Sequence, residues 1–501
     1  MSVHSAESLY IGGKWRSASD NSTREIRSPH DGSSVTFVSE ATLQDAHDAI
    51  ASARSAFDSG EFPSWSWAKR SALVARVAAF LERDAEIFAR LESDDTGKRM
   101  AEARFDIADV ISVFRYYADL GLSEHERIVQ TGESHILSRV VSEPLGVCAL
   151  IGPWNYPLLQ ASWKVAPALI AGCSFILKPS ELTPSTAIAL FRLLEEAGTP
   201  KGVANLLLGA GAVVGAPLTS DARVDLVSFT GGLATGKKIM ALASETVKKV
   251  ALELGGKNPN IIFADADLDA AIDNAVTAVF LHSGQVCSSG TRLLVERSIH
   301  DHVVGEIVLR AQRIRMGGPA DLTAETGPLI SCSHLEKVAQ YVDNAVGEGA
   351  KLLTGGRRSQ LEPLSAGWYF EPTVLDGCTT EMNCVQDESF GPVLTVEVFE
   401  TEAEVVALAN DTIYGLAGAV WTNDAEKASR VAKALRHGTI WINDFGAYRA
   451  QAEWGGYKAS GIGRELGPSG LNEYLEIKHI WTNTSPARSG WFDDARQREK
   501  I

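Results

Sequence analysis

The chain has few cysteines for its length, and it has no apolar stretch long enough to cross a membrane. No Cys-x-x-Cys pair occurs in its 501 residues, and none of the six cysteines has the spacing of a metal-ligand set. This excludes a disulfide-rich scaffold, and we expect free thiols, a reducing compartment and no metal. No apolar run reaches the roughly 18 residues that a transmembrane helix needs. The six cysteines are Cys148, Cys173, Cys287, Cys332, Cys378 and Cys384.

Basic residues are outnumbered by acidic ones, at 47 against 63, which gives a formal net charge of −16. Such a field repels nucleic acid and anionic membrane surfaces, so we expect neither as a partner. The N-terminal sequence MSVHSAESLYIGGKW has no basic segment followed by an apolar one. The absence of that pattern argues against a secretory signal and favours a cytoplasmic location.

Length and hydrophobic patterning predict an α/β protein of two or three domains. Short apolar runs suited to buried strands alternate with helical segments, and the short links between them favour a parallel sheet covered on both faces. Ligands of such sheets bind at the carboxyl ends of the strands. The expected strands are 147–151, 174–178, 203–208, 224–229 and 249–254, and the expected helices are 158–172, 184–198, 212–220 and 233–244.

A second alternating region begins at 260–267 and continues to about residue 455. Two segments with strand patterns, 134–146 and 475–483, belong to no obvious core, so we expect them to serve an interface. Near the N-terminus, residues 66–96 predict one amphipathic helix closed by Gly97. Thr183 before Pro184 predicts the N-cap of a further helix. Within the second region we expect strands at 391–399 and 418–422 and helices at 402–410 and 424–436.

Cys287 is the first candidate for covalent chemistry. It stands among small residues in GQVCSSG, a composition that predicts a tight turn entering a helix. A helix N-terminus lowers the pKa of a thiol and supplies N–H groups to an oxyanion. From this segment alone, a buried structural cysteine is the alternative interpretation.

Two polar residues at strand ends are further candidates. Glu253 closes an apolar strand, where burial raises a carboxyl pKa and suits a general base; a solvated charge is the alternative. Two glycines follow it, which favours close approach by a ligand. Asn155 lies between a strand and a helix, so its amide could donate to an oxyanion or could simply cap the helix.

Glycine-rich links at 208–215 and 229–236 join strands to helices, so their N–H groups could face a pyrophosphate, although neither matches GxGxxG. Lys178, Ser180 and Glu181 follow another strand. A lysine and a carboxylate in that position can bond ribose hydroxyls, and the carboxylate would disfavour a 2′-phosphate. Solvated surface charges are the alternative.

These segments together resemble the aldehyde dehydrogenase superfamily. PWNYPL, KPSE, FTGG, LELGGK, GQVC, ESFGPV and GGYKASGIGRE occur in this order, and the resemblance extends from IGGKW to about residue 480. It implies a Rossmann-like NAD-binding domain (1–125 and 146–255), an α/β catalytic domain (256–465) and a small β oligomerisation flap (126–145 and 466–490). A homodimer or homotetramer is implied as well.

The resemblance also implies roles for single residues. Cys287 would be the nucleophile and Glu253 the general base, and Asn155 with the Cys287 N–H would form the oxyanion hole. NAD is the implied cofactor, with Lys178 and Glu181 at one ribose and Glu388 at the other. Gly232 stands where many members have serine, a difference expected to matter little. The remaining implied cofactor residues are Trp154, Ser180, Gly211, Phe229, Thr230, Gly231, Gly232 and Phe390.

Within the superfamily, the sequence is most similar to the betaine aldehyde dehydrogenases. Tyr156 and Trp163 lie seven apart on an expected helix and so face nearly the same way, and Trp454 is a third aromatic. All three match positions that line the substrate pocket, and aromatic rings suit a quaternary ammonium through cation–π attraction. Leu281 departs from the pattern, since some members have an aromatic there.

We therefore expect the substrate to be a small aldehyde, betaine aldehyde first, oxidised to glycine betaine. The alternatives are an aminoaldehyde, a trimethylammonio-butyraldehyde or an aryl-acetaldehyde, for which the same rings would form an apolar wall. A CoA-acylating variant is less suited to a general base at Glu253. A catalytically silent structural or binding relative is the remote alternative.

Overall fold

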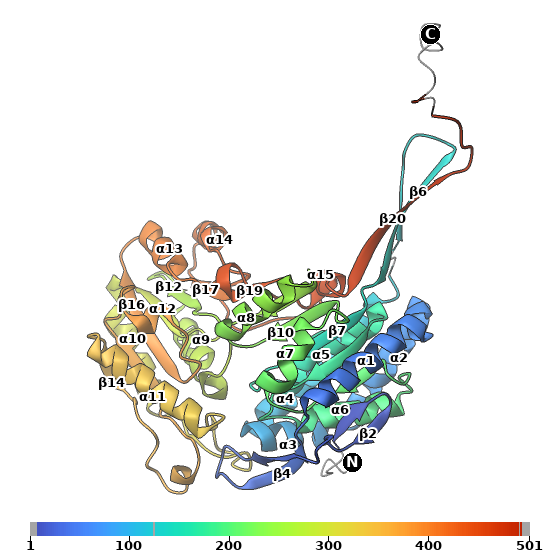
Figure 1. Ribbon diagram of the computed structural model, residues 1–501. Helices are drawn as coiled ribbons and strands as arrows, with labels where there is room; N and C mark the ends of the chain where they lie inside the picture. The colour runs from blue at the N-terminus through green and yellow to red at the C-terminus, as the bar shows by residue number, and fades with distance from the viewer. Residues whose placement is uncertain (1–7, 124–125, 490, 493–501) are drawn as a thin grey trace.

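The computed structural model describes residues 8–123, 126–489 and 491–492, which form two large sheets with helices on their faces and a projecting arm (Figure 1). Residues 1–7, part of the sequence inspected for a secretory signal, lie outside this range. Within the described residues, no helix has both the length and the apolar character that spanning a membrane requires.

The first sheet has eight strands in the order β19-β11-β10-β7-β8-β9-β1-β2. Strands β11, β10, β7, β8 and β9 are parallel, whereas β19 and β1 run antiparallel to their neighbours. All five strands expected between 147 and 254 are present within two residues of their expected bounds. The strands are β1 (Leu9–Ile11), β2 (Lys14–Arg16), β7 (Val147–Ile151), β8 (Ser174–Lys178), β9 (Ala204–Leu206), β10 (Leu226–Thr230), β11 (Lys249–Glu253) and β19 (Gly461–Ile462).

Helices cover this sheet, and the ribbon β3 (Thr23–Arg27)–β4 (Ser34–Ser39) lies near its N-terminal end (Figure 1). Every residue of β7, β8, β10 and α5 is buried, which explains why these segments are continuous apolar runs. The helices are α1 (Leu43–Ser59), α2 (Trp67–Arg83), α3 (Ala85–Thr96), α4 (Met100–Leu120), α5 (Pro157–Ala171), α6 (Ser185–Glu196), α7 (Ala216–Ser220) and α8 (Leu233–Ser244), with a π-helical turn at Gly211–Gly215 before α7.

Two helix predictions in this unit were wrong. The single helix expected over 66–96 is interrupted at Asp84, which ends α2 and begins α3; Gly97 does close α3, with φ 73°. Thr183 does not cap the next helix, because α6 begins at Ser185. The acceptor at the start of α6 comes from another helix instead, because the Ser185 N–H donates to Asp95 Oδ2 of α3 at 2.8 Å.

The second sheet has seven strands in the order β14-β15-β16-β13-β12-β17-β18, all parallel except β14. Its strands are β12 (Pro259–Ile262), β13 (Arg292–Glu296), β14 (Lys351–Thr354), β15 (Thr373–Asp376), β16 (Val393–Phe399), β17 (Ala417–Trp421) and β18 (Thr439–Ile442). Its helices are α9 (Leu268–Phe280), α10 (His300–Ala311), α11 (Cys332–Gly347), α12 (Asn383–Gln386), α13 (Glu402–Asn410) and α14 (Ala425–Ala434). The strands and helices expected in this region are therefore present.

The arm is a three-stranded antiparallel sheet in the order β20-β6-β5, which extends away from both large sheets (Figure 1). It contains β5 (Glu126–Val129), β6 (Ile136–Pro144) and β20 (Leu475–Asn483), and the short helix α15 (Gly467–Asn472) leads into β20. Both segments that showed strand patterns without a core are thus paired with each other. After Leu475, every residue of β20 is exposed, including the large side chains of Ile477 and Trp481.

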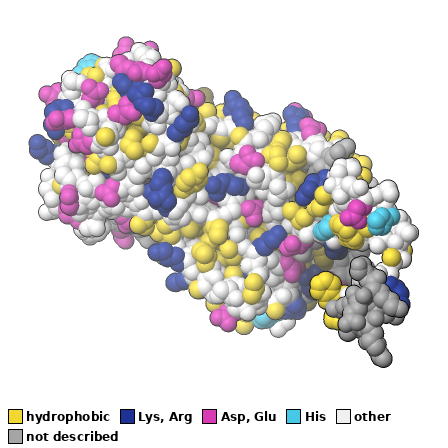
Figure 2. Space-filling model, turned by 90° about the horizontal axis from the view of Figure 1, so that it is seen from above, with side chains coloured by type: hydrophobic (Ala, Val, Ile, Leu, Met, Phe, Trp, Pro, Cys, Tyr) yellow, Lys and Arg dark blue, Asp and Glu magenta, His cyan; other side chains and the backbone are white. Residues whose placement is uncertain are grey.

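On the face drawn in Figure 2, acidic and basic side chains are interspersed, with hydrophobic groups between them. The net negative charge of the chain is therefore not gathered into one patch on this face.

Candidate active site

A cavity of about 370 Å³ lies between α4 and α5, which pack with the first sheet, and the segments around 277–289 and 445–454. The part of the chain built on the first sheet is called the first unit, and the part built on the second sheet the second unit. Its wall includes Cys287, Tyr156, Trp163 and Trp454, which are one candidate nucleophile and all three candidate substrate residues. Within the residues that the structure describes, no group of three or more His, Cys, Asp or Glu could hold a metal ion.

Cys287 lies in a turn that leads into strand β13, and the helix predicted to start at this turn is absent. Asn258 fixes the turn, because its Nδ2 donates to the main-chain oxygens of Cys287 and Ser289, both at 2.9 Å. Without a helix dipole, burial dominates and raises the thiol pKa to about 12, with the carboxylates of Glu388 and Glu253 adding to the shift. The expectation of a lowered thiol pKa was therefore wrong.

The two glycines after Glu253 are required by the protein's own groups. A Cβ at Gly255 would overlap the carboxylate of Glu388, and one at Gly256 would lie 2.7 Å from the main-chain oxygen of Cys287. The Gly256 N–H also donates to Glu388 Oε1 at 3.1 Å. These glycines thus allow Glu388 and the cysteine turn to approach the end of β11.

Glu253 is the last residue of β11, and its side chain is buried, with 5% of the residue exposed. Neither carboxylate oxygen has a hydrogen-bond partner among the described residues. Burial, followed by the nearby carboxylate of Glu465, raises the pKa of Glu253 well above its usual range. Glu465 itself forms an ion pair with Lys164, whose Nζ also donates to Thr230 Oγ1 at 2.8 Å. The raised pKa favours the protonated form of this carboxyl.

Asn155 lies between β7 and α5 but does not cap the helix, whose N-cap residue is Tyr156. Its Nδ2 donates to the main-chain oxygen of Gln285 at 2.9 Å, two residues before Cys287. An amide nitrogen has two hydrogens, so the second remains for an oxyanion beside the thiol. This contact brings Asn155 and the cysteine turn together.

Three of the residues expected at the cofactor lie at or just after the end of β8. Lys178 ends β8, and its Nζ donates to Pro179 O at 3.0 Å and lies 3.4 Å from Glu181 Oε2. Ser180 is buried and its Oγ accepts from the Leu182 N–H at 3.2 Å. The Glu181 carboxylate is partly exposed, which leaves it able to accept from a ligand.

The glycine-rich link at 229–236 joins β10 to α8, and the link at 208–215 leads into the π-helical turn before α7. Gly232 is the N-cap of α8, no side chain caps that helix, and a Cβ at Gly232 or Gly211 would meet open space. Gly231 differs, because a Cβ there would lie 2.5 Å from the ring of Phe229. Thr230 ends β10. Uncapped N–H groups at the start of α8 suit a pyrophosphate, so these residues fit a dinucleotide.

A second aromatic group contains Trp154 and Phe390, whose ring centroids are 5.2 Å apart. Phe390 has a left-handed backbone, with φ 53°, and its main-chain oxygen accepts from His334 Nε2 at 2.7 Å. Glu388, two residues earlier, has its pKa raised to about 7, chiefly by burial. Glu388 and Phe390 thus stand on the loop between α12 and β16, beside the residues that follow β11.

Three aromatic rings cluster in the cavity, and one of them was not predicted. Trp163 and Trp454 have ring centroids 6.0 Å apart, and Tyr448 lies 5.6 Å from Trp163 and 6.2 Å from Trp454. Tyr448 lies on an irregular loop, where no periodicity links it to the other rings. The Tyr156 ring already contacts a cation of the protein, because Lys98 Nζ lies 3.9 Å from the ring centroid.

Acidic side chains on α4 form another part of the wall that sequence patterning missed. Asp109 Oδ2 accepts from the Tyr448 hydroxyl at 2.6 Å, and Asp106 pairs with Lys98 at 2.5 Å. Glu102 is the third carboxylate of this face. Their spacing of three and four residues places them on one side of a helix, but no helix was predicted over 100–120.

Comparison with known proteins agrees with the fold. The model of the aldehyde dehydrogenase family matches residues 15–480, and the chain belongs to this family. A betaine aldehyde dehydrogenase from Bacillus subtilis (strain 168) is 54% identical over 97% of this chain and 100% of its own length. A peroxisomal aminoaldehyde dehydrogenase 2 from Pisum sativum is 42% identical, covering 97% of each chain. A crystal structure of a betaine aldehyde dehydrogenase from Staphylococcus aureus in complex with NAD+ superposes with a TM-score of 0.96 at 50% identity, covering 98% of this chain and 97% of that one.

Proposed function

We propose that the protein oxidises betaine aldehyde to glycine betaine with NAD+, through a thioester on Cys287. One observation carries the proposal: a single cavity holds the Cys287 thiol, the three-ring cluster of Trp163, Trp454 and Tyr448, and a face of carboxylates. A thiol suits covalent attack on an aldehyde, and aromatic faces with acidic neighbours suit a quaternary ammonium. The relatives named as betaine aldehyde dehydrogenases support the same substrate.

The chemistry follows from the chain's own residues. Cys287 Sγ, as the thiolate, attacks the carbonyl carbon and forms a C–S bond, while the carbonyl electron pair moves to oxygen. Asn155 Nδ2 and the Cys287 N–H donate to that oxyanion. NAD+, when bound, supplies the acceptor for the hydride that leaves the same carbon, and a thioester results. Glu253 then takes a proton from water, whose oxygen attacks the thioester; the C–S bond breaks, releasing the carboxylic acid, which ionises, and the Cys287 thiolate.

We assign the cofactor contacts to the residues whose placement fits a dinucleotide. Lys178 and Glu181 would hold the adenine ribose, Glu388 the nicotinamide ribose, and the N-terminus of α8 after Gly232 the pyrophosphate. Ser180, Gly211, Phe229, Thr230 and Gly231 would line the adenine side, with Trp154 and Phe390 near the nicotinamide. The carboxylate of Glu181 can accept from both ribose hydroxyls.

NAD+ should be preferred over NADP+, and Glu181→Ser should narrow the preference by about 10-fold or more. A 2′-phosphate would place a like charge beside the Glu181 carboxylate, and serine removes that repulsion. The measurement is kcat/KM for both cofactors in the wild type and the variant. Glu195→Ser, on the same unit but away from these strand ends, is the control. Equal efficiency of the wild type with both cofactors would remove Glu181 from this role.

The proposed domain division follows the two sheets and the arm. Residues 1–125 and 146–255 would bind the cofactor, 256–465 would form the catalytic domain, and 126–145 with 466–490 would form the oligomerisation segment. The exposed apolar side chains of β20, Ile477 and Trp481 among them, support a buried position in a homodimer or homotetramer. Residues 1–7, 124–125 and 490 of this division lie outside the described residues.

The substrate assignment is tested with a pair of aldehydes that differ in charge but hardly in shape. In 3,3-dimethylbutanal a carbon replaces the quaternary nitrogen of betaine aldehyde. Trp163→Leu and Trp454→Leu should each lower kcat/KM for betaine aldehyde by about 2- to 30-fold, because a desolvated cation–π contact contributes roughly 0.5–2 kcal/mol. Efficiency with the neutral aldehyde should fall much less, since only apolar contact is lost.

The control for these variants is Trp15→Leu, because Trp15 lies on β2 and contacts Arg192 rather than the cavity. Parallel losses with both aldehydes in Trp163→Leu and Trp454→Leu would make the rings a general apolar wall. That outcome would reject betaine aldehyde as the preferred substrate and leave the oxidation of aldehydes intact.

An aminoaldehyde is the second candidate, favoured by the carboxylates of Asp106 and Asp109 in the cavity wall. A primary ammonium can donate hydrogen bonds to these oxygens, which a trimethylammonium cannot do. However, Asp109 already accepts from Tyr448 and Asp106 already pairs with Lys98, so neither carboxylate is free of partners. The same substrate panel, extended to an aminoaldehyde, ranks the two.

A further inference from the structure

The chain takes a disfavoured backbone conformation shortly before the nucleophile. His282 (φ 49°, ψ 35°) and Ser283 (φ 54°, ψ 33°) are consecutive left-handed residues, and Gly284 follows with φ 70°. L-residues other than glycine seldom adopt this conformation, and two in succession are rarer still. Such a turn persists only where its surroundings hold it.

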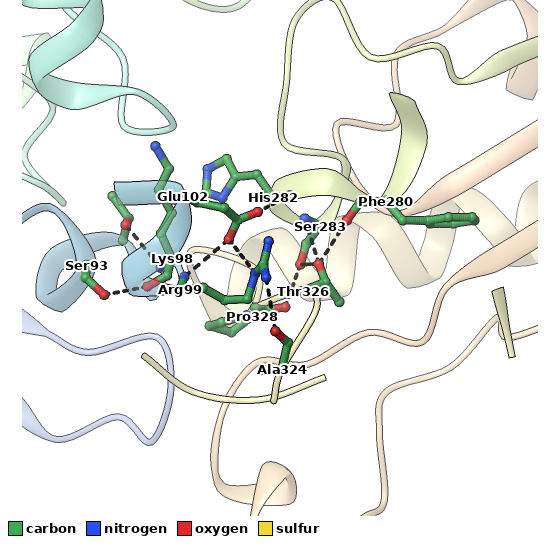
Figure 3. Close-up of polar contacts among 12 residues, drawn as sticks. Ser93, Lys98, Arg99, Glu102, Phe280, His282, Ser283, Ala324, Thr326 and Pro328 are labelled. Carbon is green, nitrogen blue, oxygen red and sulfur yellow. Dashed lines mark hydrogen bonds and ion pairs between the residues drawn. The ribbon is translucent and has the colours of Figure 1, made fainter. Parts of the chain in front are cut away.

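Hydrogen bonds from two directions hold this left-handed turn (Figure 3). On one side, Glu102 Oε1 accepts from the His282 N–H at 2.9 Å. On the other, Thr326 Oγ1 accepts from the Ser283 N–H at 3.1 Å and donates to Phe280 O at 2.9 Å. His282, Ser283 and Thr326 are all buried, so water does not replace these partners.

Glu102 is itself fixed, because its other oxygen belongs to the start of α4. Glu102 Oε2 accepts from the Arg99 N–H at 3.2 Å and from Arg99 Nε at 3.1 Å. Arg99 Nη1 in turn donates to Ala324 O at 3.0 Å, close to Thr326 in the chain (Figure 3). With only 8% of Glu102 exposed, its carboxylate joins α4 of the first unit to the left-handed turn of the second.

Two further hydrogen bonds connect the left-handed turn to Asn155 and to the segment that carries Cys287. The His282 ring donates from Nε2 to the main-chain oxygen of Asn155 at 3.0 Å. The side chain of Asn155 donates to the main-chain oxygen of Gln285, which is two residues before Cys287. A displacement of His282 would therefore move the oxyanion-binding amide and the thiol relative to each other.

We propose that Glu102 is a positioning residue, whose reach to the His282 N–H holds the left-handed turn and thereby the register of Asn155 and Cys287. The catalytic consequence rests on the proposed function of those two residues. Two other roles are possible for the same carboxylate. It could simply cap α4, or its charge could attract a cationic aldehyde, since Glu102 also lines the cavity.

Two conservative variants separate these roles. Glu102→Asp keeps the charge and can still cap α4, but it is one methylene shorter and loses the reach to His282. Glu102→Gln loses the charge and the acceptor for the Arg99 N–H, but it keeps one oxygen that can accept from the His282 N–H. Glu86→Asp is the control, because Glu86 is an exposed carboxylate on the neighbouring helix, paired with Arg104.

The first readout is the rate constant of the first turnover, measured as the NADH burst with betaine aldehyde and with 3,3-dimethylbutanal. Glu102→Asp should lower it by about 10-fold or more with both aldehydes, because small misplacement of reacting groups is costly, while KM for NAD+ stays unchanged. Glu102→Gln should remain within about 3-fold of the wild type. A larger KM for betaine aldehyde alone in Glu102→Gln would instead assign the charge role.

The second readout does not depend on activity. Hydrogen–deuterium exchange in peptides covering 278–290 should be faster in Glu102→Asp than in the wild type, and unchanged in Glu102→Gln and Glu86→Asp. A wild type that oxidises neither aldehyde would overturn the proposed function, yet the exchange data would still judge the turn. Unchanged exchange and burst rate in Glu102→Asp would overturn the positioning role, as would equal losses in both variants.

Discussion

Cys287→Ala is expected to lose aldehyde oxidation by at least about 10³-fold while it continues to bind NAD+. The thiol supplies the atom that bonds to substrate carbon, and among the described residues that line the cavity Cys287 is the only cysteine. The residues assigned to the cofactor lie on other segments, at the ends of β8 and β10 and on the loop before β16. Activity is followed as NADH formation, and cofactor binding by calorimetry.

Cys332→Ala is the matched control, because Cys332 is exposed at the start of α11, away from the cavity. It should keep full activity. A Cys287→Ala protein that retained more than about one part in a hundred of wild-type turnover would exclude a covalent route through this residue.

Glu253→Gln is expected to collapse steady turnover by about 10²- to 10⁴-fold while a burst of NADH persists. The glutamine cannot take a proton from water, so the thioester forms and is then hydrolysed slowly. Rapid-mixing absorbance distinguishes the two phases. Glu245→Gln, an exposed position at the end of α8, is the control. Equal loss of burst and steady turnover in Glu253→Gln would move this residue out of the hydrolytic step.

The raised pKa of Glu253 also fixes the direction of the pH dependence. Below this pKa the carboxyl is protonated and cannot act as a base, so hydrolysis of the thioester should quicken as pH rises through it. The slope should disappear in Glu253→Gln, which has no group to titrate. This comparison assigns the slope to Glu253 rather than to the Cys287 thiol, which is shared by both proteins.

Strands buried on both faces were the most predictable part of the fold. In β7, β8 and β10 all residues are buried, so each is an uninterrupted apolar run whose ends are visible in the sequence. The predictions of Cys287, Glu253 and Asn155 likewise rest on their places beside such strands or among small residues. That Cys287 lines the cavity and that Asn155 bonds to Gln285, two residues before it, could be seen only in the fold.

The features that were missed depend on contacts between distant segments. Asp95 serves the start of α6 from another helix, so Thr183 could not reveal that cap. Tyr448 joins the aromatic cluster from a loop, through a hydrogen bond to Asp109 on α4. A left-handed backbone is usually predicted from glycine, but His282 and Ser283 are not glycines. Hydrogen bonds to Glu102 and Thr326 hold their conformation instead.

The Tyr448–Asp109 bond has a consequence for how such a pocket can change over generations. One partner stands on α4 and the other some 339 positions later in the chain, so the two are encoded far apart. Recombination between two relatives within that interval would join a loop from one parent to a helix from the other. A buried tyrosine hydroxyl or carboxylate left without its counterpart is destabilising. This part of the pocket wall therefore depends on two distant segments, and a hybrid gene keeps the bond only when it encodes both Asp109 and Tyr448.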